Sequence, residues 1–284
     1  MFLSLNLPFL VQKTIDEILN MSYLVDMMNR FQRWRKQWLL RRYRISFRLW
    51  ERVVEDALVP YCLDHHELHR LRELASKFLH DKVINGAGGL EVDAYMRTVI
   101  AAEACLLILN LGFEFYEGWQ EIIVYPDSFV VVREGQDDAG VVHKGHAVLG
   151  GESWGRGPVI LAWEDSRPGV HLHGPDSNVI LHEFAHKLDM LNGVANGMPP
   201  LHADMDRAVW SRIFTRTDAE LHLQITRHQV THIDAYGAES PAEFFAVVTE
   251  EFFEQPAELH IWYPELYDQL SLFYRQDPLK RLLA

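Results

Sequence analysis

Hydrophobic residues recur at helical spacing in two long stretches of the first half of the chain. In "DHHELHRLRELASKFLHDKV", the apolar side chains fall on one helical face, and Asp64 stands where an N-cap is expected. "EVDAYMRTVIAAEACLLILNLG" is almost wholly apolar and ends at Gly112, which is typical of a buried helix. The apolar face of the first stretch consists of Leu68, Leu71, Leu74, Phe78 and Leu79. These patterns predict a helical N-terminal subdomain over residues 53 to 118.

The pattern then changes to short apolar runs that are typical of strands. These are "QEIIVYP", "SFVVV", "GHAVL" and "GPVILAWED". Helical spacing returns around residues 177–192, 204–224, 240–254 and 263–276. Helices followed by a small block of strands and then by helices again predict an α+β fold with a small mixed sheet, whose second domain covers residues 119 to 284.

Residues 30 to 52 differ from the rest because nine of them are basic and only Glu51 is acidic. The basic residues are Arg30, Arg33, Arg35, Lys36, Arg41, Arg42, Arg44, Arg48 and Arg52. We interpret residues 1–52 as an exposed or weakly ordered extension, which includes the case of a start codon assigned too far upstream. The alternative is a basic amphipathic helix that meets an anionic membrane or a nucleic acid.

Charge and cysteine content narrow the class of protein. The formal net charge of -13 argues against direct nucleic-acid binding, because the bulk charge would not neutralise phosphates. Two cysteines, Cys62 and Cys105, exclude a disulfide framework and fit a reducing cytoplasm. The apolar "MFLSLNLPFLV" lacks the basic start and cleavage site of a secretory signal. We therefore expect a cytoplasmic protein.

The stretch "NVILHEFAHKLDMLNG" carries the clearest chemistry, a His-Glu-x-x-His motif. In a helix, His182 and His186 lie one turn apart on one face, so both imidazoles can reach one Zn²⁺ ion. Glu183 can then act as general base on a metal-bound water. The structural alternative is a pair of histidines on a partly buried helix with a surface carboxylate.

A third zinc ligand must come from elsewhere in the chain. The HExxHxxGxxH arrangement is excluded, because Asp189 and Asn192 occupy the positions of its glycine and third histidine. The remaining common arrangement takes a glutamate from a downstream helix, here "SPAEFFAVVTEEFF". Glu243 is our preferred ligand because apolar residues surround it. Two alternatives stay open, namely that Glu243 closes a capping box with Ser240, or that a member of the solvent-facing pair Glu250 and Glu251 is the ligand.

Several of these segments together resemble a known family. "HEFAHKLD" followed by "DAYGAESPAEFFAV" resembles the bacterial Mlc titration factor A peptidases, which are zincins related to the catalytic domain of anthrax lethal factor. The likeness extends to "GFEFYEGWQEIIVYPDSFVV", "GPVILAW" and "FYRQDPLKRLL", and covers roughly residues 53 to 284. It leaves out the basic segment before residue 53.

The resemblance implies a zincin-like fold with one zinc ion held by His182, His186 and Glu243, and with Glu183 as base. It also implies that Tyr236 lines the site, where its phenol would stabilise the oxyanion of the tetrahedral intermediate. "GPVILAWED" would be the edge strand that aligns a peptide. The partners that the family implies are a peptide substrate, cleaved by an aminopeptidase-like activity, and the glucose repressor Mlc.

Three functional hypotheses follow. The first is a zinc metallopeptidase in which Glu183 is the general base. The second is a non-catalytic protein that sequesters a transcriptional repressor on a zincin scaffold; the intact motif favours the enzyme, because binding alone needs no base. The third is a protease recruited to a membrane through residues 30 to 52. Asp189 is expected behind the metal ligands, in a salt bridge on its own helix, or facing solvent. His171 and His173 are too weak a signal to include in the site.

Overall fold

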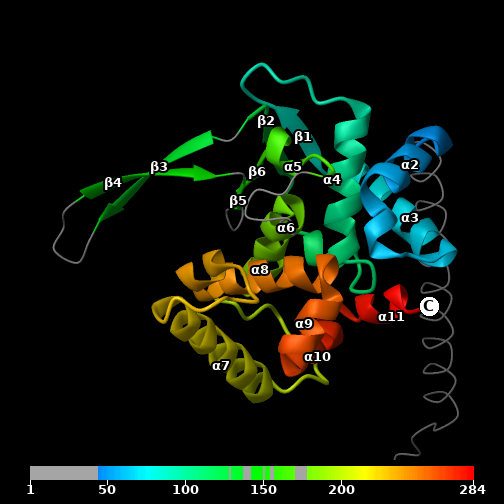
Figure 1. Cartoon of the computed structure of the whole chain (residues 1–284). Helices are drawn as coiled ribbons and strands as arrows, with labels where there is room; N and C mark the ends of the chain where they lie inside the picture. Colours follow the sequence, from blue (N-terminus) through cyan, green and yellow to red (C-terminus); the bar gives the residue numbers. More distant parts are fainter. Residues whose placement is uncertain (1–43, 128, 137–141, 150, 154–156, 170–177) are drawn as a thin grey trace, which may run out of the picture. The chain divides into compact units, whose positions relative to one another are not determined.

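The computed structural model describes residues 44–127, 129–136, 142–149, 151–153, 157–169 and 178–284. Within it, residues Ile45–Ala284 form one compact unit, shown in Figure 1. The predicted extension over residues 1–52 lies outside the described residues except for its last nine positions. No helix of the described residues is long and apolar enough to cross a bilayer.

The N-terminal part of this unit is mainly helical. It comprises α2 (Phe47–Val53), a π-helical turn (Val54–Leu58), a 3-10 turn η2 (Val59–Tyr61), α3 (His65–Asp81) and α4 (Ala94–Leu107). Asp64 caps α3 as expected, because its carboxylate accepts the amides of His66 and Glu67. Helix α2 lies in the range predicted to be an extension, yet Ile45 and Trp50 are buried in the core. The folded unit therefore includes the end of the basic segment.

A four-stranded sheet has the order β1-β2-β6-β5. Its strands are β1 (Val83–Gly86), β2 (Glu121–Tyr125), β5 (Gly151–Ser153) and β6 (Val159–Ala162). The first three in this order are parallel, and β5 pairs antiparallel with β6. The sheet is therefore mixed, as predicted. The expectation that "GPVILAWED" forms an edge strand is wrong, because β6 pairs on both sides and β5 lies at that edge.

Between β2 and β5 the chain forms an antiparallel hairpin of β3 (Phe129–Gln136) and β4 (Val142–Leu149), which extends away from the helices in Figure 1. After β6 comes a single helical turn, α5 (Trp163–Ser166). The predicted strand over "GPVILAWED" thus ends at Ala162, and its last residues are helical.

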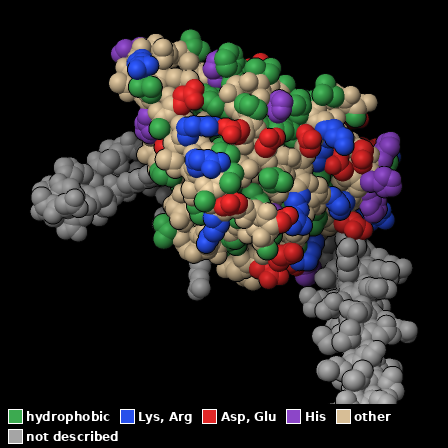
Figure 2. Space-filling view, turned by 90° about the horizontal axis from the view of Figure 1, so that it is seen from below, with side chains coloured by type: hydrophobic (Ala, Val, Ile, Leu, Met, Phe, Trp, Pro, Cys, Tyr) green, Lys and Arg blue, Asp and Glu red, His purple; other side chains and the backbone are tan. Residues whose placement is uncertain are grey.

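The C-terminal part is again helical. Its helices are α6 (Val179–Asp189), α7 (Arg207–Thr226), α8 (Pro241–Glu254), α9 (Pro256–Trp262), α10 (Pro264–Tyr274) and α11 (Pro278–Leu282). A short 3-10 segment, η4 (Met190–Asn192), follows α6, and another, η5 (Ala235–Glu239), precedes α8; η3 (Phe113–Tyr116) follows α4 in the N-terminal part. On the face seen in Figure 2, acidic and basic side chains are interspersed with hydrophobic ones.

Helix α6 occupies the centre of the unit. Figure 1 shows it between the sheet and α8, and every residue from Val179 to Asp189 is buried. An aromatic cluster anchors it to the N-terminal part. The ring of Phe184 lies 5.4 Å from that of Tyr116 and 5.7 Å from those of Phe78 and Trp119, measured between centroids. Close packing on all sides fixes the direction in which the polar side chains of α6 project.

Candidate metal centre

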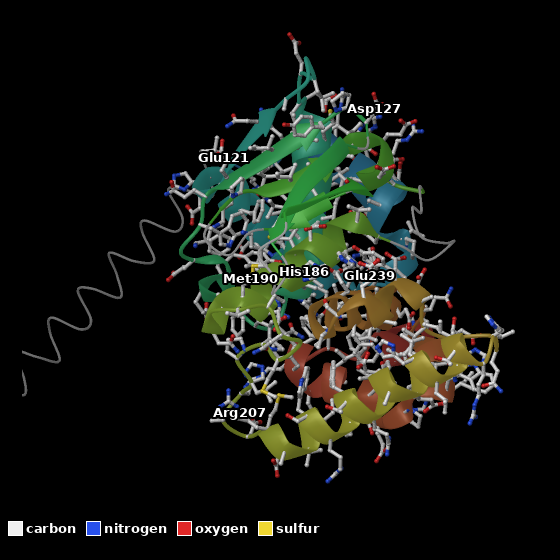
Figure 3. The ribbon with its side chains drawn as sticks, turned by 90° about the vertical axis from the view of Figure 1, so that its left-hand side faces the viewer. Glu121, Asp127, His186, Met190, Arg207 and Glu239 are labelled. Carbon is white, nitrogen blue, oxygen red and sulfur yellow. The ribbon has the colours of Figure 1, made fainter. Side chains whose placement is uncertain are left out.

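Helix α6 presents two histidines on the face that meets α8. The helix begins at its N-cap Asn178, whose side-chain oxygen accepts the Leu181 amide at 3.0 Å. His182 and His186 follow one turn apart, with ring centroids 4.8 Å apart and an interplanar angle of 80°. Their Nε2 atoms are 3.2 Å from each other. Figure 3 shows His186 where α6 adjoins the segment that leads through Glu239 into α8.

Helix α8 supplies a carboxylate to the same point. Ser240 caps the helix by accepting the Glu243 amide at 3.2 Å, and Pro241 occupies the first turn, where its missing N–H costs nothing. The Glu243 side chain turns toward the histidines, with Oε2 at 2.9 Å from His182 Nε2 and 3.2 Å from His186 Nε2. Only the Ser240 half of the capping box is therefore formed among the described residues.

These three groups have the chemistry of a metal-binding set. One atom from each of His182, His186 and Glu243 lies within 4.8 Å of the others, and all three residues are largely shielded from water. Two imidazole nitrogens and one carboxylate oxygen are the donors that a Zn²⁺ site of the catalytic type uses. Although burial raises the pKa of Glu243, its hydrogen bonds with the two histidines hold it far below the ordinary value. The carboxylate is thus ionised and ready to bind a cation.

A second carboxylate contacts His182 from the opposite side. Glu250 Oε1 lies 2.6 Å from His182 Nδ1, and Glu250 is only 5% exposed. The interpretation of Glu250 and Glu251 as a solvent-facing pair is therefore wrong. Glu251 is also engaged, because its Oε1 accepts the Asp234 amide at 3.0 Å. Burial lowers the pKa of His182, but the charge of Glu250 and the hydrogen bonds with Glu243 and Glu250 outweigh it and raise that pKa.

The two residues assigned to catalysis both lie next to the histidines. Glu183 directly follows His182 on α6 and is buried. Tyr236 lies in η5, and its ring centroid is 5.8 Å from that of His182. Asp234 holds the start of this turn by accepting the Tyr236 amide at 2.8 Å. The structure thus brings together all five residues singled out from the sequence.

No salt bridge of Asp189, at the end of α6, is formed among the described residues. Its Oδ2 accepts the amides of Asn196 and Gly197, both at 2.7 Å, and the side chain is fully buried. The carboxylate therefore fastens the loop after α6. His171 and His173 lie outside the described residues.

The site has the donor set of a metallopeptidase. Comparison with known proteins agrees with this class. The profile of a family described as glucose-regulated metallo-peptidase M90 matches residues 31–275. A protein named Mlc titration factor A from Serratia proteamaculans (strain 568) is 40% identical over 234 residues, which are 80% of this chain and 88% of that one. Its namesake from Yersinia pestis (strain Pestoides F) is 39% identical over 223 residues, 78% of this chain and 82% of the relative.

The chain belongs to this metallopeptidase family, the M90 peptidases, and to the Mlc titration factor A group in particular. The resemblance found in the sequence is thereby confirmed. Its extent differs at one end, because the match begins at residue 31 and includes most of the basic segment.

Proposed function

We propose that this protein is a zinc-dependent peptidase with a zincin-like active site. The observation that carries the proposal is the convergence of His182 Nε2, His186 Nε2 and Glu243 Oε2 beside Glu183 and Tyr236. Zinc held by the first three would polarise the scissile carbonyl and lower the pKa of a bound water. The remaining steps fall to side chains of the protein.

Glu183 would act as the general base. It takes the proton from the attacking water and passes it to the leaving amine, so one carboxylate serves both halves of the reaction. Tyr236 would donate a hydrogen bond to the oxyanion that develops on the carbonyl. Its position beside the His182 ring supports this role.

An extended peptide substrate can pair with the backbone of a strand at the edge of a sheet, and β5 is the edge strand beside β6. It lies next to α6 and runs antiparallel to β6. The family resemblance implied that β6 aligns the peptide. We assign this role to β5 instead. The preference for an amino-terminal residue, the aminopeptidase-like activity, is part of the proposal. So is the cytoplasmic location, which the two unpaired thiols of Cys62 and Cys105 support.

The test of the base is a comparison of wild type with Glu183→Gln. We expect the variant to retain zinc and to lose peptidase activity, because the amide cannot accept the proton. A variant that keeps both zinc and full activity would show that Glu183 is not the base. Arg216→Gln, which alters an exposed pair with Glu265, serves as the control for handling and folding.

The test of the metal site is the zinc content of Glu243→Ala. Removal of one of three protein donors should abolish most bound zinc, measured by metal analysis after gel filtration. Unchanged zinc in this variant would transfer the ligand role to another residue.

A second function is favoured by the name of the relatives, Mlc titration factor A. We propose that the protein also binds a repressor of the Mlc type where the host has one. Capture of purified Mlc by wild type and by Glu183→Gln separates the two functions. Equal capture with no turnover in the variant means that repressor binding is independent of hydrolysis.

A further inference from the structure

The imidazole of His182 lies between two carboxylates. Glu243 Oε2 faces Nε2 at 2.9 Å, and Glu250 Oε1 faces Nδ1 at 2.6 Å. A neutral imidazole that gives the Nε2 lone pair to a metal must carry its proton on Nδ1. Glu250 is the acceptor for that proton. His186 differs, since its Nδ1 is buried and has no hydrogen-bond partner among the described residues.

Glu250 is itself held in place. Glu243 and Glu250 are seven residues apart on α8, about two turns, so both project toward α6. The second oxygen of Glu250 accepts the backbone amide of Asn178 at 2.7 Å. Asn178 is the N-cap of α6 and also donates to Glu254 Oε1 at 3.1 Å. Both oxygens of Glu250 therefore have fixed partners on the helix that carries the histidines.

We propose that Glu250 is a positioning residue that fixes the tautomer and orientation of His182 and thereby strengthens metal binding. This inference rests on the proposed zinc function. A carboxylate behind a ligating histidine raises the basicity of the imidazole and removes its freedom to rotate.

A glutamine at this position cannot reproduce the arrangement. Glu250 must accept one hydrogen bond from the Asn178 amide and another from His182 Nδ1. It uses a different oxygen for each, but a carboxamide has only one oxygen. If that oxygen faces Asn178, the amide NH₂ group faces Nδ1 and favours the tautomer with its proton on Nε2. If it faces His182, two donors oppose each other at Asn178. Glu250→Gln thus changes the side chain little in size, and it either reverses the tautomer of His182 or leaves two donors opposed at Asn178.

The experiment measures zinc affinity by competition with a chromogenic chelator, using the full chain as wild type, Glu250→Gln and the control Glu265→Gln. The control removes the same charge from an exposed side chain on α10. We expect Glu250→Gln to weaken zinc binding roughly 10- to 100-fold and the control to match wild type. Melting of the metal-free proteins shows whether each is folded. Equal zinc affinity in wild type and Glu250→Gln overturns the inference and leaves the zinc site standing. A wild type that takes up no zinc overturns the proposed function itself.

A second measurement needs no variant. In a long-range ¹⁵N–¹H spectrum of the zinc-loaded wild type, we expect His182 to carry its proton on Nδ1, with the proton shifted downfield by the hydrogen bond to Glu250. A proton on Nε2 of His182 contradicts the inference, whatever the stability of Glu250→Gln. This signature reports the tautomer and does not follow from a purely structural role of Glu250.

Discussion

Gly197 lies against the carbonyl group of Pro241. A β-carbon on Gly197 would stand 2.5 Å from the Pro241 oxygen and 3.1 Å from its carbonyl carbon. Pro241 is the first residue of α8, two positions before Glu243. Asp189 holds Gly197 from the other side through the Gly197 amide, and the Trp210 indole donates to the Gly197 carbonyl at 3.1 Å. The loop after α6 therefore determines where the helix that carries Glu243 begins.

Gly197→Ala should destabilise the fold and weaken zinc binding together. The new methyl group meets backbone atoms that cannot move aside as a side chain would, and the φ angle of +75° adds strain. We expect a loss of about 1–3 kcal/mol in the free energy of unfolding, measured by urea denaturation, with reduced zinc affinity.

Gly193→Ala is the matched control in the same loop. Its φ angle is +128°, but a β-carbon there has no neighbour within 4 Å. It shares the backbone strain and lacks the collision with α8. If both variants lose the same zinc affinity, the contact with Pro241 is not what places Glu243.

Ser240→Ala should lower stability while zinc uptake continues. Loss of the N-cap acceptor leaves the Glu243 amide without its side-chain partner, which costs about 1 kcal/mol. The packing of Phe244 and Phe245 still holds the helix in place. Metal analysis and thermal melting should therefore separate this variant from Glu243→Ala. Complete loss of zinc in Ser240→Ala would mean that the cap itself sets the position of the ligand.

Tyr61→Phe should destabilise the junction between η2 and α6. The buried Tyr61 hydroxyl donates to Glu254 Oε1 at 2.5 Å and accepts the Asn178 side-chain amide at 3.2 Å. Its removal leaves the half-buried carboxylate of Glu254 with one donor fewer, at a cost of about 1–3 kcal/mol in urea denaturation. Tyr95→Phe, which removes a more exposed bond to Asp56, should cost much less. An equal loss of unfolding free energy in the two variants would show that the Tyr61 hydrogen bonds stabilise the fold no more than the exposed bond of Tyr95 does.

Lys82 should make stability rise with pH above neutrality. Burial lowers the pKa of its amine from 10.5 to about 8, while the amine donates to the carbonyls of Tyr116 and Trp119. Between these two values the unfolded chain binds the extra proton and the folded protein does not, so the free energy of unfolding increases with pH. Lys82→Met removes this contribution. Urea denaturation from about pH 7 to about pH 10 should give a smaller rise for the variant than for wild type, and parallel curves would contradict the assignment.

The spacing of apolar residues within single segments was enough to predict most of the helices. The helices α3, α4, α6 and α8 follow from apolar periodicity and from caps such as Asp64, because these signals lie within one turn of each helix. The ligand spacing in α6 is equally local. Strand β1 was not predicted, because four residues at the end of a helical pattern become a strand only through pairing with β2. The interior position of β6 likewise depends on strand order, which no local pattern contains.

The burial of Glu250 was missed for a different reason. Two adjacent acidic residues usually face solvent, and Glu250 was predicted to be exposed for that reason. The prediction did not consider that Glu250 lies seven residues after Glu243. Since α8 is covered on most sides by apolar packing, that spacing places Glu250 on the inner face beside His182. The same spacing offered a usable signal, because two carboxylates on one buried helical face need partners.

The donors that meet at His182 come from distant parts of the chain, since Glu243 follows His182 by 61 residues. During synthesis, α6 leaves the ribosome long before α8 exists. A nascent chain thus carries the histidine pair without its third donor, and the set is completed only when α8 packs on α6. On the proposed function, hydrolysis cannot begin before α8 has been made and has packed on α6.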